Sequence, residues 1–169
     1  IGFRYYEALI KSDMNIELYI FDKYKKNYIN FLNSRNNKLK ILKIKSIKNL
    51  KKKIDLVIIA TTSDSRVEVL KKILKVATIK KVIFEKTLCR SIRQLSVLKK
   101  LNNQYNLKSW ISSPKPTWLD YLKLKKKINY KKNKQFSILV NGSNWGFASN
   151  IIHFLHLVDY IFDSPNIIS

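Results

Sequence analysis

The chain is poor in the residues that cross-link, bend or break small folds. It has 3 glycines, 3 prolines and 1 cysteine among its 169 residues. A single cysteine, Cys89, excludes an internal disulfide framework and a multi-cysteine metal site. The 2 histidines argue against a zinc site, and no apolar run reaches the ~18 residues that a membrane-spanning helix needs. No signal peptide is evident at the start. We therefore expect a cytoplasmic protein with no metal and no membrane partner.

Acidic residues are also scarce, with 11 Asp and Glu against 34 Lys and Arg, which gives a formal net charge of +23. Such a charge can indicate a nucleic-acid partner. However, the chain is rich in Lys, Ile, Asn and Tyr, and its lysines are spread over many segments. Nucleic-acid readers usually depend on arginine for bidentate contacts. We therefore attribute the charge to composition and expect no nucleic-acid partner. The arginines are Arg4, Arg35, Arg66, Arg90 and Arg93.

What is present is an alternation of short apolar runs with longer amphipathic stretches. Hydrophobic residues make up 46% of the chain, enough to form a core. The run 54–62 is continuously apolar and rich in β-branched residues, as expected of a strand buried on both faces. Alternating strands and helices predict an α/β protein with a doubly wound parallel sheet. The predicted strands are 15–22, 38–44, 54–62, 80–85 and 107–113. The predicted helices are 2–11, 26–35, 65–78, 91–105 and 118–128, with Ser91 as a cap and a shorter helical turn at 46–53.

The pattern changes after residue 134, where a predicted strand at 135–142 is followed by a predicted helix at 149–162. We interpret this change as the start of a second domain. The predicted organisation is a nucleotide-binding domain at 1–114, a connecting helix and linker at 115–134, and the beginning of an α+β domain at 135–169.

A glycine and an acid at the start of the chain resemble the end of a dinucleotide-binding fingerprint. Gly2 precedes a predicted helix that would pack closely on the sheet, and Asp22 ends the next strand, 20 residues later. The first two glycines of the fingerprint and the strand before them are absent. We therefore expect that the sequence is a fragment, that its sheet has a gap at the missing strand, and that about 5–10 further upstream residues would supply a strand.

Several stretches together resemble the glucose-fructose oxidoreductase/inositol dehydrogenase (Gfo/Idh/MocA) family. They are G-F-R-Y at 2–5, F-D at 21–22, D-L-V-I-I-A-T-T-S-D-S-R at 55–66, V-I-F-E-K-T at 82–87 and N-W-G-F-A-S-N-I-I-H-F-L-H at 144–156. The resemblance implies a Rossmann-type domain followed by an α+β domain. It also implies hydride transfer between NAD, or alternatively NADP, and a sugar, nucleotide-sugar or cyclitol. We expect the complete protein to be a homo-oligomer with a small-molecule substrate.

In this resemblance Lys86 matches the lysine of an E-K-P motif at the end of a strand. It would contact a substrate hydroxyl and help to carry its proton. Glu85 would face the cofactor or anchor the turn. Thr87 stands where the family has proline, and we expect a trans bond before it, because a cis bond costs ~2.5–4 kcal/mol outside proline. Arg66 stands where a histidine is common, and we interpret it as a surface or phosphate-side residue.

Two histidines on the last predicted helix are candidates for the second acid/base. His153 and His156 are three residues apart and share a helix face. An N-x-x-H register selects Asn150 with His153, whereas an H-x-x-D register selects His156 with Asp159. A histidine near neutral pH suits the transfer of a hydroxyl proton.

The resemblance assigns the remaining site residues by position. Asp22 would accept hydrogen bonds from the adenosine ribose, and its charge favours NAD over NADP, although Lys23 partly offsets this preference. The residues expected at the cofactor are Gly2, Phe3, Arg4, Asp22, Lys23, Ala60, Thr61, Thr62, Glu85 and Lys86. Those expected at the substrate are Lys115, Trp145, Asn150 and His153.

Two other functions remain open at this point. The chain could be a catalytically degenerate relative that binds a cofactor or acts as a scaffold, because Thr87 and Arg66 depart from the family pattern. A nucleic-acid-binding domain, suggested by the charge alone, is less favoured.

Overall fold

The computed structural model describes residues 2–24, 38–128, 137–144 and 146–163. The chain divides into two compact units, Ile1–Trp110 and Ile111–Ser169. None of the helices in these described stretches is long and apolar enough to cross a membrane.

The first unit contains a small parallel sheet of two strands. Strand β1 (Ile16–Ile20) pairs with β2 (Leu39–Lys43), with Ile16 opposite Leu39 at one end and Ile20 opposite Lys43 at the other. Both strands were predicted from their apolar alternation, and both are confirmed. The helix predicted at 26–35 lies outside the described residues.

A second sheet has the order β3-β4-β5, formed by β3 (Lys53–Ile59), β4 (Thr78–Glu85) and β5 (Lys108–Ser112). Strands β3 and β4 are parallel. Within the described residues β1-β2 and β3-β4-β5 are separate sheets, with no strand pairing between them. The predicted α/β fold with parallel sheets is confirmed.

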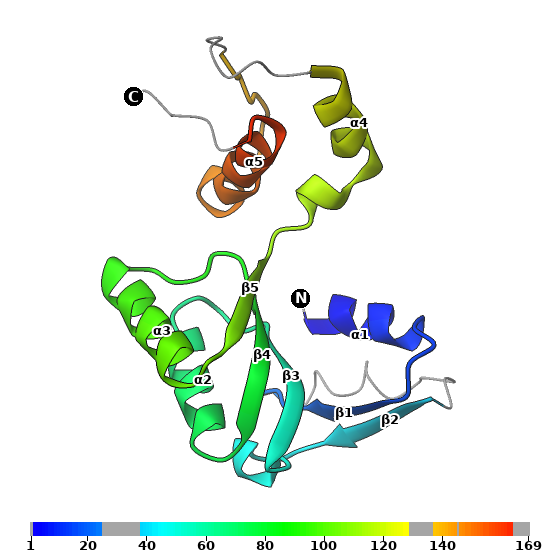
Figure 1. Cartoon of the computed structure of the whole chain (residues 1–169), viewed down its shortest axis with the longest axis vertical. Helices are drawn as coiled ribbons and strands as arrows, with labels where there is room; N and C mark the ends of the chain where they lie inside the picture. The colour runs from blue at the N-terminus through cyan, green and yellow to red at the C-terminus, as the bar shows by residue number, and fades with distance from the viewer. Residues whose placement is uncertain (1, 25–37, 129–136, 145, 164–169) are drawn as a thin grey trace. The chain divides into compact units, whose positions relative to one another are not determined.

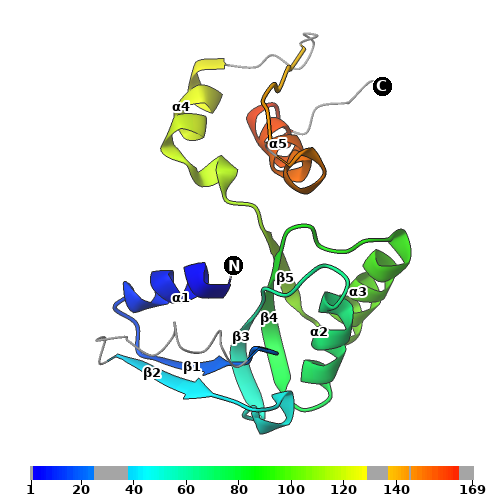
Figure 2. The ribbon, with the colours of Figure 1, turned by 180° about the vertical axis from the view of Figure 1, so that it is seen from behind.

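Three helices of the first unit flank these strands: α1 (Gly2–Ile10), α2 (Arg66–Leu74) and α3 (Ile92–Gln104). A short 3₁₀ helix, η2 (Ile47–Asn49), replaces the predicted turn at 46–53. In Figures 1 and 2, α2 and α3 lie together on one side of the β3-β4-β5 sheet and α1 lies on the other. Ser91 caps α3 as predicted, because its hydroxyl accepts a hydrogen bond from the Gln94 amide.

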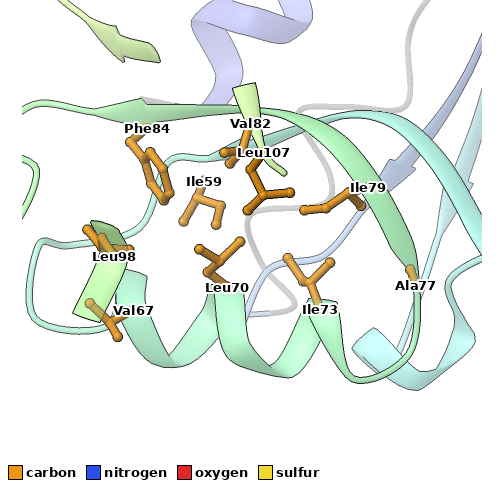
Figure 3. Close-up of a cluster of buried hydrophobic side chains, with 10 residues drawn as sticks. All are labelled: Ile59, Val67, Leu70, Ile73, Ala77, Ile79, Val82, Phe84, Leu98 and Leu107. Atoms are coloured by element: carbon orange, nitrogen blue, oxygen red, sulfur yellow. The ribbon is translucent and has the colours of Figure 1, made fainter. Parts of the chain in front are cut away.

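The main hydrophobic core lies between α2, α3 and the β3-β4-β5 sheet. Figure 3 shows Leu70 and Ile73 of α2 pointing toward Ile59 and the side chains of β4. Leu70 and Val82 are fully enclosed, with 0% of their surface exposed. The helices contribute hydrophobic residues that recur at helical spacing, and the strands contribute residues of mostly apolar runs. Its members are Ile59, Val67, Leu70, Ile73, Ala77, Ile79, Val82, Phe84, Leu98 and Leu107.

Strand β3 is less buried than its sequence predicts. Asp55 is exposed and Leu56 keeps 42% of its surface exposed, so burial on both faces is wrong for this part of the strand. Successive side chains of a strand point to opposite faces. The helices α2 and α3 cover one of these faces, and the described residues leave the other partly open at Leu56.

The second unit is built from a 3₁₀ turn and two helices: η3 (Lys115–Thr117), α4 (Leu119–Ile128) and α5 (Phe147–Ile161). Its buried cluster consists of Leu157, Ile161 and Phe162, with Tyr121, Val158 and Tyr160 packed against it. Lys125 connects the two helices, because its ammonium donates to the Tyr160 carbonyl and to Asp163 Oδ1, both at 2.6 Å.

The strand predicted at 135–142 does not form in the part that the structure describes. Residues 137–142 are irregular, and residues 135 and 136 lie outside the described residues. An apolar run becomes a strand only when its backbone finds a hydrogen-bonding partner. No strand among the described residues of the second unit pairs with this segment.

Candidate functional site

The carboxyl ends of β3 and β4 form one edge of the sheet in the first unit. The two strands are parallel, and Ile59 at the end of β3 pairs with Phe84 next to the end of β4. The residues after each strand are therefore neighbours. Ala60, Thr61 and Thr62 follow β3, and Lys86 follows β4 directly after Glu85. The structure thus brings together the predicted residues of these two segments.

Arg66 holds this edge together, and its predicted place at the surface is wrong. Its side chain is 2% exposed. The guanidinium donates through Nε and Nη2 to the Thr61 carbonyl, at 3.0 and 2.8 Å, and through Nη2 to the Lys86 carbonyl at 3.2 Å. It also donates through Nη1 to the carbonyls of Glu85 and Thr87. The planar arrangement of its donors explains how one side chain can serve both strand ends.

The burial of Arg66 has an electrostatic cost that its surroundings partly offset. Removal from water lowers the pKa of the Arg66 guanidinium, whereas the negative charge of Glu85 opposes this shift. Arginine nevertheless stays protonated in proteins, so a permanent positive charge lies beneath the strand ends. We found no sequence signal for this role beyond the substitution of a family histidine by Arg66.

The peptide bond between Lys86 and Thr87 is cis, so the predicted trans bond is wrong. The trans bond was predicted from the local preference alone, because a peptide bond that does not precede proline strongly favours trans. In the folded chain, three successive carbonyls, those of Glu85, Lys86 and Thr87, all accept hydrogen bonds from Arg66. Contacts from a distant part of the chain therefore accompany a conformation that the local sequence disfavours.

Glu85 is buried and contacts the first helix. It is 8% exposed, and its Oε1 accepts a hydrogen bond of 2.6 Å from the Tyr5 hydroxyl. Of the two predicted roles of Glu85, anchoring is the one that this contact favours. Tyr5 was not predicted as a site residue, although it closes the G-F-R-Y stretch that contributed to the family resemblance.

Gly2 begins α1 beside the end of β3. A methyl group added at Gly2 would lie 3.9 Å from the Ala60 side chain, which is an ordinary van der Waals distance. The predicted proximity of this helix to the sheet is therefore present, but it does not by itself require glycine. Phe3 and Arg4 follow on the exposed side of α1.

Asp22 lies just after the end of β1. Its Oδ1 accepts a hydrogen bond of 2.8 Å from the Tyr24 amide, which fixes the carboxylate in a local turn. The ammonium of Lys23 lies 5.7 Å from the centroid of the Tyr24 ring. The structure thus places Asp22 just beyond a parallel strand, as predicted.

In the second unit, His153 is held by a neighbouring hydroxyl. Its Nδ1 lies 3.1 Å from Ser113 Oγ, and the side chain is half-buried, as is that of Asn150. His156, one turn further along α5, is exposed. The contact with Ser113 favours His153 as the oriented histidine, because an acid/base needs a partner that fixes its ring. Trp145 lies outside the described residues.

Lys115 lies among three aromatic rings of the second unit. Its ammonium is 4.2 Å from the centroid of Phe154, 5.3 Å from that of Trp118 and 5.9 Å from that of Tyr121. Contacts of this kind attract a cation to the face of a ring. They favour a packing role for Lys115, and its predicted substrate contact stays a prediction.

The candidate residues therefore fall into two groups. Lys86 belongs to the first unit and His153 to the second, and their joint action stays a prediction. Within the described ranges, no group of three or more His, Cys, Asp or Glu side chains is placed to hold a metal ion.

Comparison with known proteins shows the fold. The chain is similar to the crystal structure of the probable oxidoreductase yhhX, with a TM-score of 0.57 and 16% identity over 86% of this chain and 45% of that one. It is equally similar to an inferred oxidoreductase from Bacteroides fragilis, with a TM-score of 0.57 and 16% identity over 86% of this chain and 43% of that one. The chain thus spans less than half the length of either protein. No family profile matches it. No curated protein matches it either.

Proposed function

We propose that this chain is the cofactor-binding part of an NAD(P)-dependent oxidoreductase that acts on a hydroxyl or carbonyl group of a sugar, nucleotide-sugar or cyclitol. The observation that carries the proposal is the strand-end edge at Ala60–Thr62 and Glu85–Lys86, held by Arg66. In α/β sheets ligands bind outside the carboxyl ends of the strands, where the strand order reverses. Here the described strands form two sheets, β1-β2 and β3-β4-β5, with a division between them.

The residues around this division fit a dinucleotide. The amino end of α1, at Gly2, carries no acidic residue in its first turn and would attract a pyrophosphate through the helix dipole. Asp22, fixed by the Tyr24 amide, would accept hydrogen bonds from the adenosine ribose. Its negative charge would repel a 2′-phosphate, so NAD is preferred over NADP. When bound, the nicotinamide supplies the hydride chemistry, and the protein supplies orientation and charge.

The chain's own part in the reaction would be to hold the substrate hydroxyl and move its proton. Lys86, at the end of β4, would hydrogen-bond the hydroxyl oxygen. His153 would exchange the proton through Nε2, because its Nδ1 faces Ser113. His156 is the alternative for this step, and Asn150 would help to bind the substrate.

A specific observation supports a second candidate, a cofactor-binding relative without catalysis. The contacts of Lys115 with the rings of Phe154, Trp118 and Tyr121 favour a packing role over the predicted substrate contact. Such a protein would bind the nucleotide through the first unit and turn over no substrate.

The binding step can be tested by titrating the chain with NADH and following its fluorescence. Asp22→Ala should weaken binding about tenfold, equivalent to about 1.4 kcal/mol. Asp55→Ala is the matched control, because Asp55 is an exposed acid of the same unit within β3. Absence of NADH binding by the unaltered chain would contradict the proposal.

A panel of sugars and cyclitols, assayed with NAD and NADP, then separates the two candidates. Turnover supports the oxidoreductase, whereas NADH binding with no turnover across the panel supports the non-catalytic relative. Tight DNA binding that weakens steeply with salt would instead favour a nucleic-acid function.

A further inference from the structure

Among the described residues of the first unit, Arg66 is a buried polar side chain with hydrogen bonds to four backbone carbonyls. It lies at the first position of α2, and its guanidinium reaches two loops that are distant in sequence. Its contact with Thr61 spans five residues, and those with Glu85, Lys86 and Thr87 span about twenty. Each of these acceptors is a backbone carbonyl, so Arg66 determines where the backbone runs.

The turn after β4, Glu85–Thr87, receives hydrogen bonds from Arg66 at all three of its carbonyls. It carries no proline, and its last residue, Thr87, is exposed. The Glu85 side chain is occupied by Tyr5 at the opposite side of the turn. A buried cation whose donors are matched by several carbonyls makes charge-assisted hydrogen bonds, which are stronger than neutral ones. These bonds act on the three residues that direct the Lys86 side chain.

We propose that Arg66 is the positioning residue of the strand-end site: its guanidinium fixes the Glu85–Thr87 turn against the end of β3 and so directs Lys86. This role rests on the proposed function for its consequence, which is the alignment of Lys86 with a bound nucleotide and substrate. The geometric part concerns the chain alone. A proline would restrict the turn through its own ring, whereas Arg66 restricts it through hydrogen bonds from another segment of the chain.

Lysine cannot replace arginine in this position. A lysine ammonium is a compact charge with three donors, whereas the guanidinium presents five donors in a rigid plane. Arg66→Lys would keep the positive charge but could not serve Thr61 and the three carbonyls of the turn together. Arg66→Met would keep most of the volume and lose every donor.

The test compares Arg66→Met and Arg66→Lys with a control variant, Arg90→Met. Arg90 is an exposed arginine near the same loops. Each variant is treated with an amine-reactive reagent, and the labelling of Lys86 is measured by mass spectrometry relative to Lys81. Lys81 is an exposed lysine of the same strand and serves as the internal reference. Thermal melting establishes that each variant is folded, and NADH affinity is measured in parallel.

In folded Arg66→Met, the relative labelling of half-buried Lys86 should rise by a factor of about three, because the turn opens locally. NADH affinity should fall about tenfold. Free guanidinium ion, added at a concentration that leaves the unaltered chain folded, should restore the labelling ratio. The labelling ratio of Arg66→Lys should lie between those of Arg66→Met and the unaltered chain. The ratio of Arg90→Met should match that of the unaltered chain.

An unchanged labelling ratio in a folded Arg66 variant would overturn the positioning role. If Arg66→Met does not fold, Arg66→Lys decides, because it retains the charge and loses only the shared geometry. The two proposals fail separately. A changed labelling ratio in a chain that does not bind NADH would support the positioning role and contradict the proposed function.

Discussion

The first unit contains a large cluster of buried hydrophobic side chains, whereas the cluster of the second unit is small. Ten buried residues of α2, α3, the β3-β4-β5 sheet and their connections form the first cluster, while Leu157, Ile161 and Phe162 form the second. In the second unit two lysines make prominent contacts: Lys115 lies among aromatic rings, and Lys125 of α4 donates to the Tyr160 carbonyl of α5. The comparison teaches that the same lysine-rich composition supports a layered core in one place and a helix pair held by cation contacts in another.

We expect the largest effect from a substitution that removes a catalytic candidate of the first unit. In the catalytically competent protein, Lys86→Ala should lower turnover by ~10²–10⁴-fold, the usual effect of losing an acid/base. Lys81→Ala, at an exposed position of β4, is the control and should leave turnover unchanged. Steady-state kinetics with NAD would measure both. Unchanged turnover in Lys86→Ala would refute the role of Lys86 and shift attention to His153 in the second unit.

A pair of core substitutions compares the packing of the two units. Leu70→Ala in α2 removes a side chain with 0% exposure and should lower the free energy of unfolding by about 2–5 kcal/mol. Leu157→Ala in α5, where the leucine is 7% exposed, should cost less because its cluster is smaller. Urea unfolding followed by circular dichroism measures both. Equal costs would contradict the distinction between a large and a small core.

Acid should produce the smallest effect, in the two-stranded sheet of the first unit. Lys51, at 2.6 Å, and the Tyr19 hydroxyl both contact Glu17 and lower its pKa from 4.5 to about 2. A lowered carboxyl pKa contributes stability above the unfolded value, and this stability is lost as the pH falls from 4.5 to about 2. The exposure of the group keeps the contribution small.

The measurement is the free energy of unfolding of the unaltered chain and of Glu17→Gln across that pH range. The difference between the two free energies should shrink as the pH falls, because protonation of Glu17 removes the same negative charge that the substitution removes. Glu7→Gln, an exposed acid of α1, is the matched control. A difference that stays constant with pH would show that these contacts with Glu17 contribute no linked stability.

Most described elements could be predicted because their signals are local. Five strands and the helices α1 to α5 appear where apolar spacing and the Ser91 cap indicated them. The exceptions have a common reason. The run at 137–142 has strand-like residues but no partner strand among the described residues, and Leu56 lies on a face that the described helices leave open. Pairing and covering are properties of the surroundings, which periodicity does not report.

The candidate site divides in the same way. The order of strands and helices was enough to place Lys86, Glu85 and Ala60–Thr62 at adjacent strand ends, because parallel strands of one sheet end at one edge. The same reasoning assigned Arg66 to the surface or to the phosphate side, and the first of these is wrong. Its burial depends on carbonyls about twenty residues away, and the Tyr5–Glu85 hydrogen bond joins residues 80 positions apart.

By itself, then, the sequence determined an α/β chain with an acid after its first described strand, a lysine after its fourth and two histidines on its last helix. The tertiary structure alone decided that Arg66 connects two strand ends, that the bond before Thr87 is cis, and that aromatic rings enclose Lys115. The physical reason is range. Secondary structure follows from spacing within a few residues, whereas the partners of a buried charge come from wherever folding brings a carbonyl or a ring within contact distance.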